Sequence, residues 1–334
     1  MMAADLIDLT GFDPSRGRAE AVSARMRGRL AESLRYIVDQ AAGHITVPAA
    51  EMERFLERLA SGPVSPLVFG IYCDLVLAID ANALDNAEEL LRELVASPNA
   101  PADLRVLDLG DPNIDPSANR YLRLVDTDES LPFTISPPAR SGAAAVRGLI
   151  AEAFDLLDAG NPRLAGEVRV LLNEIVLASG SDDPAEVQFD GVSSFLLWGA
   201  TVLEVRSYKT ALEMVQALAH ESGHNLLFGL CADGPLHTND DNERFSSPLR
   251  IDPRPMDGII HAAYVTARMH QSVQRLLDAG VLNAAQTAEA RVAVVTNAKR
   301  FAMGMDTVDR DAKLTPLGQT VMDNARAYMA SYLS

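Results

Sequence analysis

Residues 210–230 restrict the fold of this chain more than any other segment. Their apolar side chains recur at the spacing of an α-helix, so the segment is expected to form a helix with a buried face. This helix also carries His220, Glu221 and His224. Such polar groups are costly to bury unless they are paired or bind a ligand. The apolar positions that set the period are Leu212, Val215 and Ala219.

The spacing of the two histidines indicates a metal site. His220 and His224 are four residues apart, so on a helix their side chains share one face, with about 5–6 Å between their β-carbons. Two imidazoles placed in this way can bind one metal ion, and Glu221 beside them can orient or deprotonate a metal-bound water. A bare HExxH pattern also occurs by chance, with a purely structural role. The apolar surroundings of this one favour the metal site.

Two residues are candidates for the third metal ligand. A metzincin has a further histidine six residues after the second one, but Leu230 occupies that position. Glu243 has the spacing of a gluzincin ligand, although its surroundings are typical of a loop. His261 is expected one turn inside a helix that starts near Pro255, with Asp257 on the same face. We prefer His261 and keep Glu243 as the alternative.

A site of three histidines leaves coordination positions open, which suits a catalytic zinc or a non-haem iron. A keto acid bound to iron would need an arginine for its distal carboxylate. Arg244, Arg250 and Arg254 lie between the two histidine-bearing segments. Each of them could instead pair with a neighbouring aspartate, and for any single arginine that is the simpler interpretation.

The rest of the chain favours an α+β, mostly helical fold: a zincin-like HExxH helix beside a small β-sheet, with an N-terminal helical region. A Pro-rich connector suggests a boundary near residue 135, between an N-terminal helical domain (1–135) and the HExxH metal-binding catalytic domain (136–334). Further helices are expected at 16–40, 49–59, 85–95 and 143–170, the last with a break at 160–162. Strands are expected at 105–111, 120–126 and 174–179, and a hairpin at 193–205 that turns near Trp198–Gly199.

Charge and cysteine content narrow the function classes. The chain of 334 residues has 46 acidic and 29 basic side chains and a formal net charge of -17. This balance disfavours binding to nucleic acids or anionic membranes, which need clustered Lys and Arg. Cys73 and Cys231 are the two cysteines and form no CxxC motif. With no signal-peptide pattern and no long apolar run, the expected location is the cytoplasm.

The stretch LAHESGHNLLFGL, followed by SSPLR and DPRPMDGIIHA, resembles the HExxH-motif peptide-modification proteins of ribosomal peptide natural-product biosynthesis. The resemblance covers residues 215–270 and implies an α-ketoglutarate-dependent peptide β-hydroxylase. It implies iron(II), α-ketoglutarate and dioxygen as cofactors, and a precursor peptide and other peptide-maturation enzymes as partners. By position, His220 and His224 match the motif's metal ligands and Glu221 its glutamate, which would orient a ligand or water. Arg250 and Arg254 are the candidates for binding the keto acid.

Two other functions remain open. In a zinc metallopeptidase that removes a leader peptide, Glu221 would be the general base, and Tyr264 or His237 could stabilise the oxyanion. A non-enzymatic HExxH domain that presents peptides to a partner enzyme is disfavoured by the intact His220, Glu221 and His224.

Overall fold

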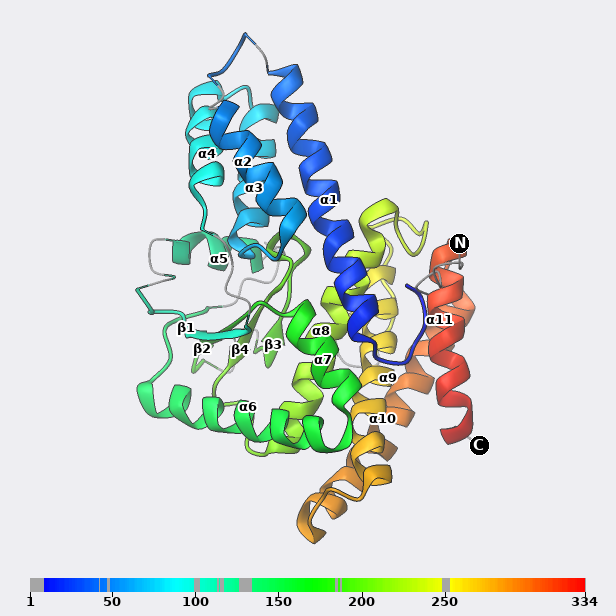
Figure 1. Ribbon diagram of the computed structural model, residues 1–334. Coiled ribbons are helices and arrows are strands. Elements are labelled where there is room, and N and C mark those ends of the chain that lie inside the picture. Colours follow the sequence, from blue (N-terminus) through cyan, green and yellow to red (C-terminus); the bar gives the residue numbers. More distant parts are fainter. Residues whose placement is uncertain are drawn as a thin grey trace, which may run out of the picture. The chain divides into compact units, whose positions relative to one another are not determined.

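A computed structural model describes residues 9–41, 43–46, 49–98, 103–112, 114, 117–125, 134–183, 186, 188–247 and 253–333 (Figure 1). The described chain is mostly helical and contains a four-stranded sheet. The prediction of a mostly helical α+β fold is therefore confirmed. Within these residues, no helix combines the length and apolarity that crossing a membrane requires.

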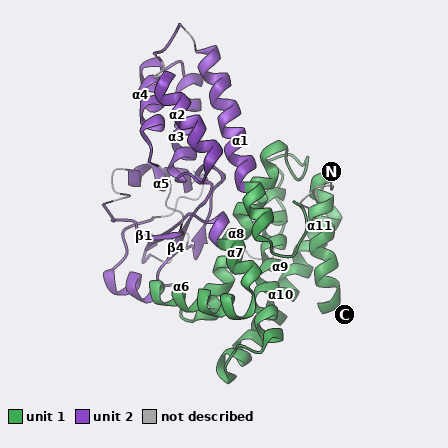
Figure 2. Ribbon diagram, viewed as in Figure 1, with its two compact units in different colours: residues 1–22, 146–168, 208–334 green, residues 23–145, 169–207 purple. Residues whose placement is uncertain are grey.

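The chain forms two compact units, coloured separately in Figure 2. Unit 1 contains residues 1–22, 146–168 and 208–334, and unit 2 contains residues 23–145 and 169–207. This division differs from the contiguous domains 1–135 and 136–334 that we predicted. Three of the unit boundaries lie inside helices, so these helices carry the chain from one unit into the other. No local sequence pattern reveals such a boundary, because contacts between distant segments decide which residues form a unit. They are α1 (Arg16–Gln40), α6 (Arg140–Gly160) and α7 (Pro162–Leu171).

The helices of unit 2 follow the predicted apolar periods in most places. Those expected at 16–40, 49–59 and 85–95 are confirmed as α1, α2 (Ala49–Ser61) and α4 (Leu84–Ala96), and α3 (Leu67–Asp80) lies between the last two. The strand predicted at 120–126 is wrong, because residues 120–125 lie in helix α5 (Ala118–Val125) and residue 126 is outside the described residues. Its buried side chains, Tyr121, Leu124 and Val125, have i, i+3, i+4 spacing, which is the period of a helix and not of a strand.

The sheet of unit 2 has the order β1-β2-β4-β3. Strands β1 (Arg105–Asp108), β2 (Glu174–Ala178) and β4 (Ala200–Glu204) are parallel, and β3 (Gly191–Val192) is antiparallel to β4. Every residue of β2 and β4 is buried, as expected for strands covered on both faces. The strands predicted at 105–111 and 174–179 are confirmed.

The predicted hairpin at 193–205 is confirmed only in its second half. β3 and β4 do pair as a hairpin, but a 3₁₀ turn (Phe195–Leu197) occupies part of the expected first strand. Ser194 caps this turn by accepting a hydrogen bond from the backbone N–H of Leu196. The predicted glycine turn is present, since Gly199 has φ of 95°, a conformation that favours glycine.

Four long helices build most of unit 1: α8 (Ala211–Leu230), α9 (Met256–Ala279), α10 (Ala284–Asp311) and α11 (Pro316–Met329). Thr210 begins α8 with a capping box that includes Glu213, so the predicted start of this helix is confirmed. α8 packs against α9 at Gly223, where a β-carbon would lie 3.1 Å from Cγ1 of Val265. The missing side chain of Gly223 thus lets the two helices approach closely.

Gly318, near the start of α11, faces a second close contact. A β-carbon at this position would lie 1.9 Å from the carbonyl oxygen of Leu236, so the backbone would have to move. We expect Gly318→Ala to lower the free energy of unfolding by about 1–3 kcal/mol, the usual cost of overpacking. The matched control is Gly148→Ala in α6, where a β-carbon meets no atom within 4 Å.

The control substitution should leave the protein unchanged or more stable by about 0.5–1 kcal/mol, because alanine favours the helix. Urea unfolding of both variants measures the difference. Equal stability of the two variants would contradict the close contact at Gly318.

Candidate metal centre

One stripe of α8 reaches the surface of an otherwise buried helix. His220, His224 and Phe228 are partly exposed and follow each other at four-residue intervals, whereas Glu221 and Gly223 between them are buried. This stripe lies next to α9, because the helices meet at Gly223. The sequence HESGH therefore supplies both the polar side chains and the close approach of the neighbouring helix.

The structure brings together the three histidines that we predicted as metal ligands, called here the histidine cluster: His220, His224 and His261. The Nε2 atoms of His220 and His224 are 3.0 Å apart. The Nδ1 atoms of His224 and His261 are 2.9 Å apart, and these two rings are nearly parallel, at 17°. His224 is thus in contact with both of the other rings.

Asp257 lies close to one member of the cluster. Its Oδ1 lies 3.7 Å from Nε2 of His261, which favours a proton on that nitrogen. In each of the two contacts, between His261 and His224 and between His224 and His220, one ring nitrogen must carry a proton and the other must not. The tautomers of the three rings therefore depend on one another.

Burial favours the uncharged form of two rings of the cluster, His224 and His261. It lowers the pKa of His224 well below the ordinary value, and the positive charges that His220 and His261 would carry lower it further. Burial also lowers the pKa of His261, although Asp257 acts in the opposite direction. Neutral imidazole is the form that binds a metal ion, so burial prepares these two rings to act as ligands.

The donor set fits a metal ion, but the ring nitrogens do not yet converge on one point. His224 directs one nitrogen to each neighbour, and among the described residues no three His, Cys, Asp or Glu side chains surround a common metal position. Three imidazoles, of which the middle one contacts the other two, still have the donor chemistry of a zinc or iron site. Metal binding would require at least one ring to rotate, because one nitrogen of His224 must serve as the ligand.

Glu221 is buried at the edge of the cluster. Its Oε1 lies 3.9 Å from Nε2 of His220, the nitrogen that also faces His224. A carboxylate at this position can orient a ligand or accept a proton close to His220.

Glu243, the alternative third ligand, has other partners. It is exposed and lies in a loop, as predicted from its surroundings. Nδ2 of Asn239 donates to its Oε2 at 3.2 Å, and Nζ of Lys313 lies 3.9 Å from its Oε1. His261, by contrast, is in direct contact with His224. The geometry therefore favours His261 as the third ligand.

The predicted arginines are only partly located. Arg250 lies outside the described residues. Arg254 lies just before α9, where its backbone exchanges two hydrogen bonds of 2.8 Å with Phe245. It therefore lies two residues before the first residue of α9, the helix that carries His261. Exposed Arg244 donates to the backbone carbonyls of Asp241 and Glu243.

Two contacts of the cluster were missed by the sequence analysis. Phe228 lies against it, with its ring centroid 5.1 Å from that of His261 and 6.2 Å from that of His224. Sδ of Met269 lies 3.4 Å from Nδ1 of His220. Phe228 could have been found from its position four residues after His224, whereas Met269 needed the packing of α9 on α8.

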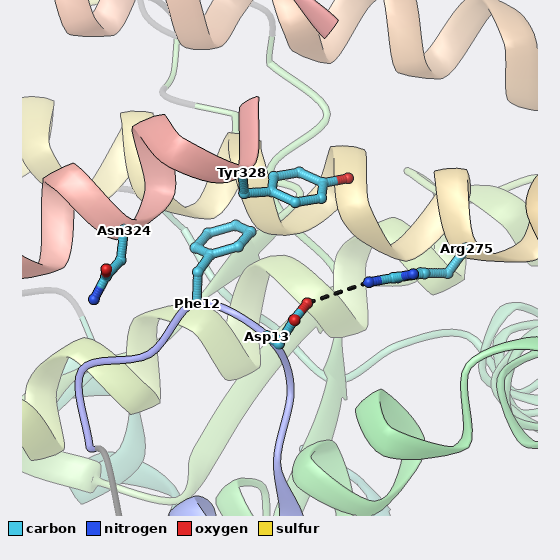
Figure 3. Close-up of a pocket in the computed structure, with 5 residues that line it drawn as sticks. All are labelled: Phe12, Asp13, Arg275, Asn324 and Tyr328. Carbon is cyan, nitrogen blue, oxygen red and sulfur yellow. Dashed lines mark hydrogen bonds and ion pairs between the residues drawn. The ribbon is translucent and has the colours of Figure 1, made fainter. Parts of the chain in front are cut away.

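A small cavity of about 280 Å³ lies elsewhere in unit 1 (Figure 3). Its lining residues are Phe12, Asp13, Arg275, Asn324 and Tyr328. Asp13 and Arg275 form an ion pair of 3.4 Å across it, and the ring of Tyr328 stacks on Phe12. The hydroxyl of Tyr328 lies 2.9 Å from Nδ1 of His270 behind it. This cavity thus adjoins a buried histidine outside the histidine cluster.

His270 makes stability depend on pH. Burial lowers its pKa to about 4, from an ordinary value of about 6.5. The unfolded chain therefore binds more protons than the folded one between these values, so folding becomes less stable as the pH falls from about 6.5 to about 4. We expect His270→Gln to weaken this dependence. Urea unfolding of both proteins at several pH values measures it, and parallel curves would contradict the expected role of His270.

No protein-family model matches this chain, and no curated protein matches it significantly. The geometry of unit 1 and the sequence motifs are therefore the basis for a functional proposal.

Proposed function

We propose that this protein is an iron(II)- and α-ketoglutarate-dependent dioxygenase that hydroxylates the β-carbon of a residue in a ribosomally made precursor peptide. The observation that supports it best is the histidine cluster: three imidazoles from α8 and α9, with His224 in contact with both of the others. This cluster supports a metal site. The resemblance of residues 215–270 to the HExxH peptide-modification proteins supports iron and the keto acid.

In this proposal His220, His224 and His261 hold the metal. Iron would supply the activation of dioxygen at the expense of the keto acid. Asp257 orients His261 through Nε2, and Glu221 orients a ligand beside His220. Arg254 or Arg250 binds the distal carboxylate of α-ketoglutarate. Phe228 excludes water from one side of the rings by its contacts with His224 and His261.

We further propose a zincin-like arrangement of α8 and the sheet, a cytoplasmic location, and other peptide-maturation enzymes as partners. All three proposals come from the sequence. The structure describes α8 in unit 1 and the sheet in unit 2, each by itself.

A zinc metallopeptidase that removes a leader peptide is the second candidate, favoured by one observation. Oε1 of Glu221 lies 3.9 Å from Nε2 of His220, so a carboxylate lies close to a proposed metal ligand, where a peptidase needs its general base. Tyr264 is a poor oxyanion donor, because it is 1% exposed and packs edge-on against Phe12. His237 remains available for that role.

The two functions are separated by metal and cofactor dependence. The protein, purified without oxygen and loaded with Fe(II), should convert α-ketoglutarate to succinate when air is admitted. A precursor peptide that is a substrate should gain about 16 Da, the mass of one inserted oxygen atom. Cleavage of the same peptide by the zinc-loaded protein without keto acid would support the peptidase and contradict the dioxygenase.

A further inference from the structure

The cavity in Figure 3 has no part in the proposed function. Its five lining residues all belong to unit 1 and come from the segment before α1, from α9 and from α11: Phe12, Asp13, Arg275, Asn324 and Tyr328. The volume of about 280 Å³ is close to the lower end of the range of about 300–1,000 Å³ that small-molecule pockets cover. A ligand of this cavity would therefore be small.

Hydrogen bonds from α9 and α11 hold one wall of the cavity in place. Nδ2 of Asn324 donates to the backbone carbonyl of Thr10 at 3.0 Å. Nε2 of Gln271, a completely buried residue, donates to Oδ1 of Asp13 at 2.8 Å. The backbone that carries Phe12 is thus attached on both sides, so the tertiary contacts of unit 1 preserve the shape of this wall.

The ion pair of the cavity leaves hydrogen-bonding groups for a ligand. Nη2 of Arg275 lies 3.4 Å from Oδ1 of Asp13, which is longer than the about 2.7–3.2 Å of an ordinary hydrogen bond. In the described part of the chain, Arg275 forms no other hydrogen bond, and Oδ2 of Asp13 forms none. A guanidinium group has five N–H donors. Both side chains are half exposed, 49% and 55%, so a ligand can reach them.

An aromatic surface lies beside the ion pair. The ring of Tyr328 stacks on that of Phe12, with 4.8 Å between the centroids and 23° between the planes. Figure 3 shows the two rings one above the other, with the ion pair to one side of Phe12. Tyr328 is partly exposed. A ligand that reaches the two charged groups can therefore place an apolar group against an aromatic ring.

We propose that this cavity binds a free α-amino acid as its zwitterion. The carboxylate accepts hydrogen bonds from Arg275, and the ammonium group donates to Oδ2 of Asp13. The two charged groups of an α-amino acid are attached to one carbon atom, so they match an arginine and an aspartate that are in direct contact. A simple carboxylic acid or amine would match only one of these side chains. The side chain of the amino acid lies against Tyr328.

The test uses the metal-free protein in the presence of EDTA, because an amino acid could also chelate a metal ion at the histidine cluster. Each of the twenty standard L-amino acids is titrated and followed by ligand-observed NMR. We expect saturable binding of at least one of them, with a Kd below about 1 mM. The N-acetyl and the carboxamide derivatives of the best ligand each lack one charge. Each should bind about tenfold more weakly, since the charged groups are half exposed.

Two variants assign the charges. Arg275→Gln should lower the affinity about tenfold and remove the preference for the free acid over its carboxamide. Asp13→Asn keeps an acceptor for Gln271 but should remove the preference for the free amine over the N-acetyl derivative. The matched control is Arg16→Gln, which breaks an exposed ion pair on α1 and should bind like the wild type.

Three results would overturn the proposal. They are the absence of saturable binding for all twenty amino acids, binding that appears only when metal is present, and equal affinity for the amino acid and both derivatives. Reduced affinity in Arg275→Gln with an unchanged preference for the free acid would also contradict it, because the arginine would then support the fold and not the ligand.

Discussion

Replacing His224 with alanine is expected to remove metal binding. His224 is the ring that touches both other members of the histidine cluster, with 3.0 Å to His220 and 2.9 Å to His261. Without His224, the two remaining imidazoles, His220 and His261, lose the ring that contacts both of them. We expect metal affinity to fall by more than about 100-fold, or roughly 3 kcal/mol, with loss of any metal-dependent activity. Titration with Fe(II) and with zinc, followed by metal analysis of the desalted protein, measures the effect.

The matched control is His44→Ala, which removes an exposed histidine of unit 2. It should bind metal like the wild type. Comparing His261→Ala with Glu243→Ala identifies the third ligand: we expect the first to lose metal and the second to keep it. Metal retained by His261→Ala but lost by Glu243→Ala would show a gluzincin-type site instead.

Replacing Glu167 with alanine is expected to cause the largest loss of stability. This carboxylate is completely buried in α7, between two buried arginines. Nη2 of Arg18 lies 2.6 Å from Oε2, and Arg268 pairs with Oε1. Removing Glu167 would leave two buried guanidinium groups without their carboxylate. Breaking a buried ion pair in this way costs about 3–5 kcal/mol, a large part of the about 5–15 kcal/mol that stabilises a typical domain.

Urea unfolding at constant pH measures this loss. Glu20→Ala is the control, because Glu20 forms an exposed ion pair with Arg16 one turn away on α1. Such surface pairs contribute about 0–1 kcal/mol, so the control should remain close to wild type. Similar losses in the two variants would show that the buried carboxylate adds nothing beyond an ordinary surface charge.

The buried ion pairs were not foreseen from the sequence. Glu167, Arg18 and Arg268 are on α7, α1 and α9, and each of them is an ordinary charged residue of an amphipathic helix when only its own segment is considered. Their carboxylate and guanidinium groups meet only because the parts of these three helices that belong to unit 1 pack together. Oε2 of Glu167 also accepts the backbone N–H of Ser15, so it anchors the segment that leads into α1.

The strand error at 120–126 has a different cause. The apolar residues Tyr121, Leu124 and Val125 fit a helical face, but the stretch is short and lies between a predicted strand and a Pro-rich connector. Over so few residues, helical and alternating periods are difficult to distinguish, and packing decides. In unit 2 these side chains join the buried core beneath the sheet residues Val176 and Val202, which requires a helix here.

The sequence by itself determined the helices with long apolar periods, the start of α8 at its capping box, and the shared face of His220 and His224. These features depend on residues within one or two helical turns, so local spacing is sufficient. Only the tertiary structure decided that His261 touches His224, that His237 forms a β-bridge with Leu314 between α10 and α11, and that α1, α6 and α7 join the two units. These features depend on contacts between residues far apart in the chain, which a periodic pattern does not encode.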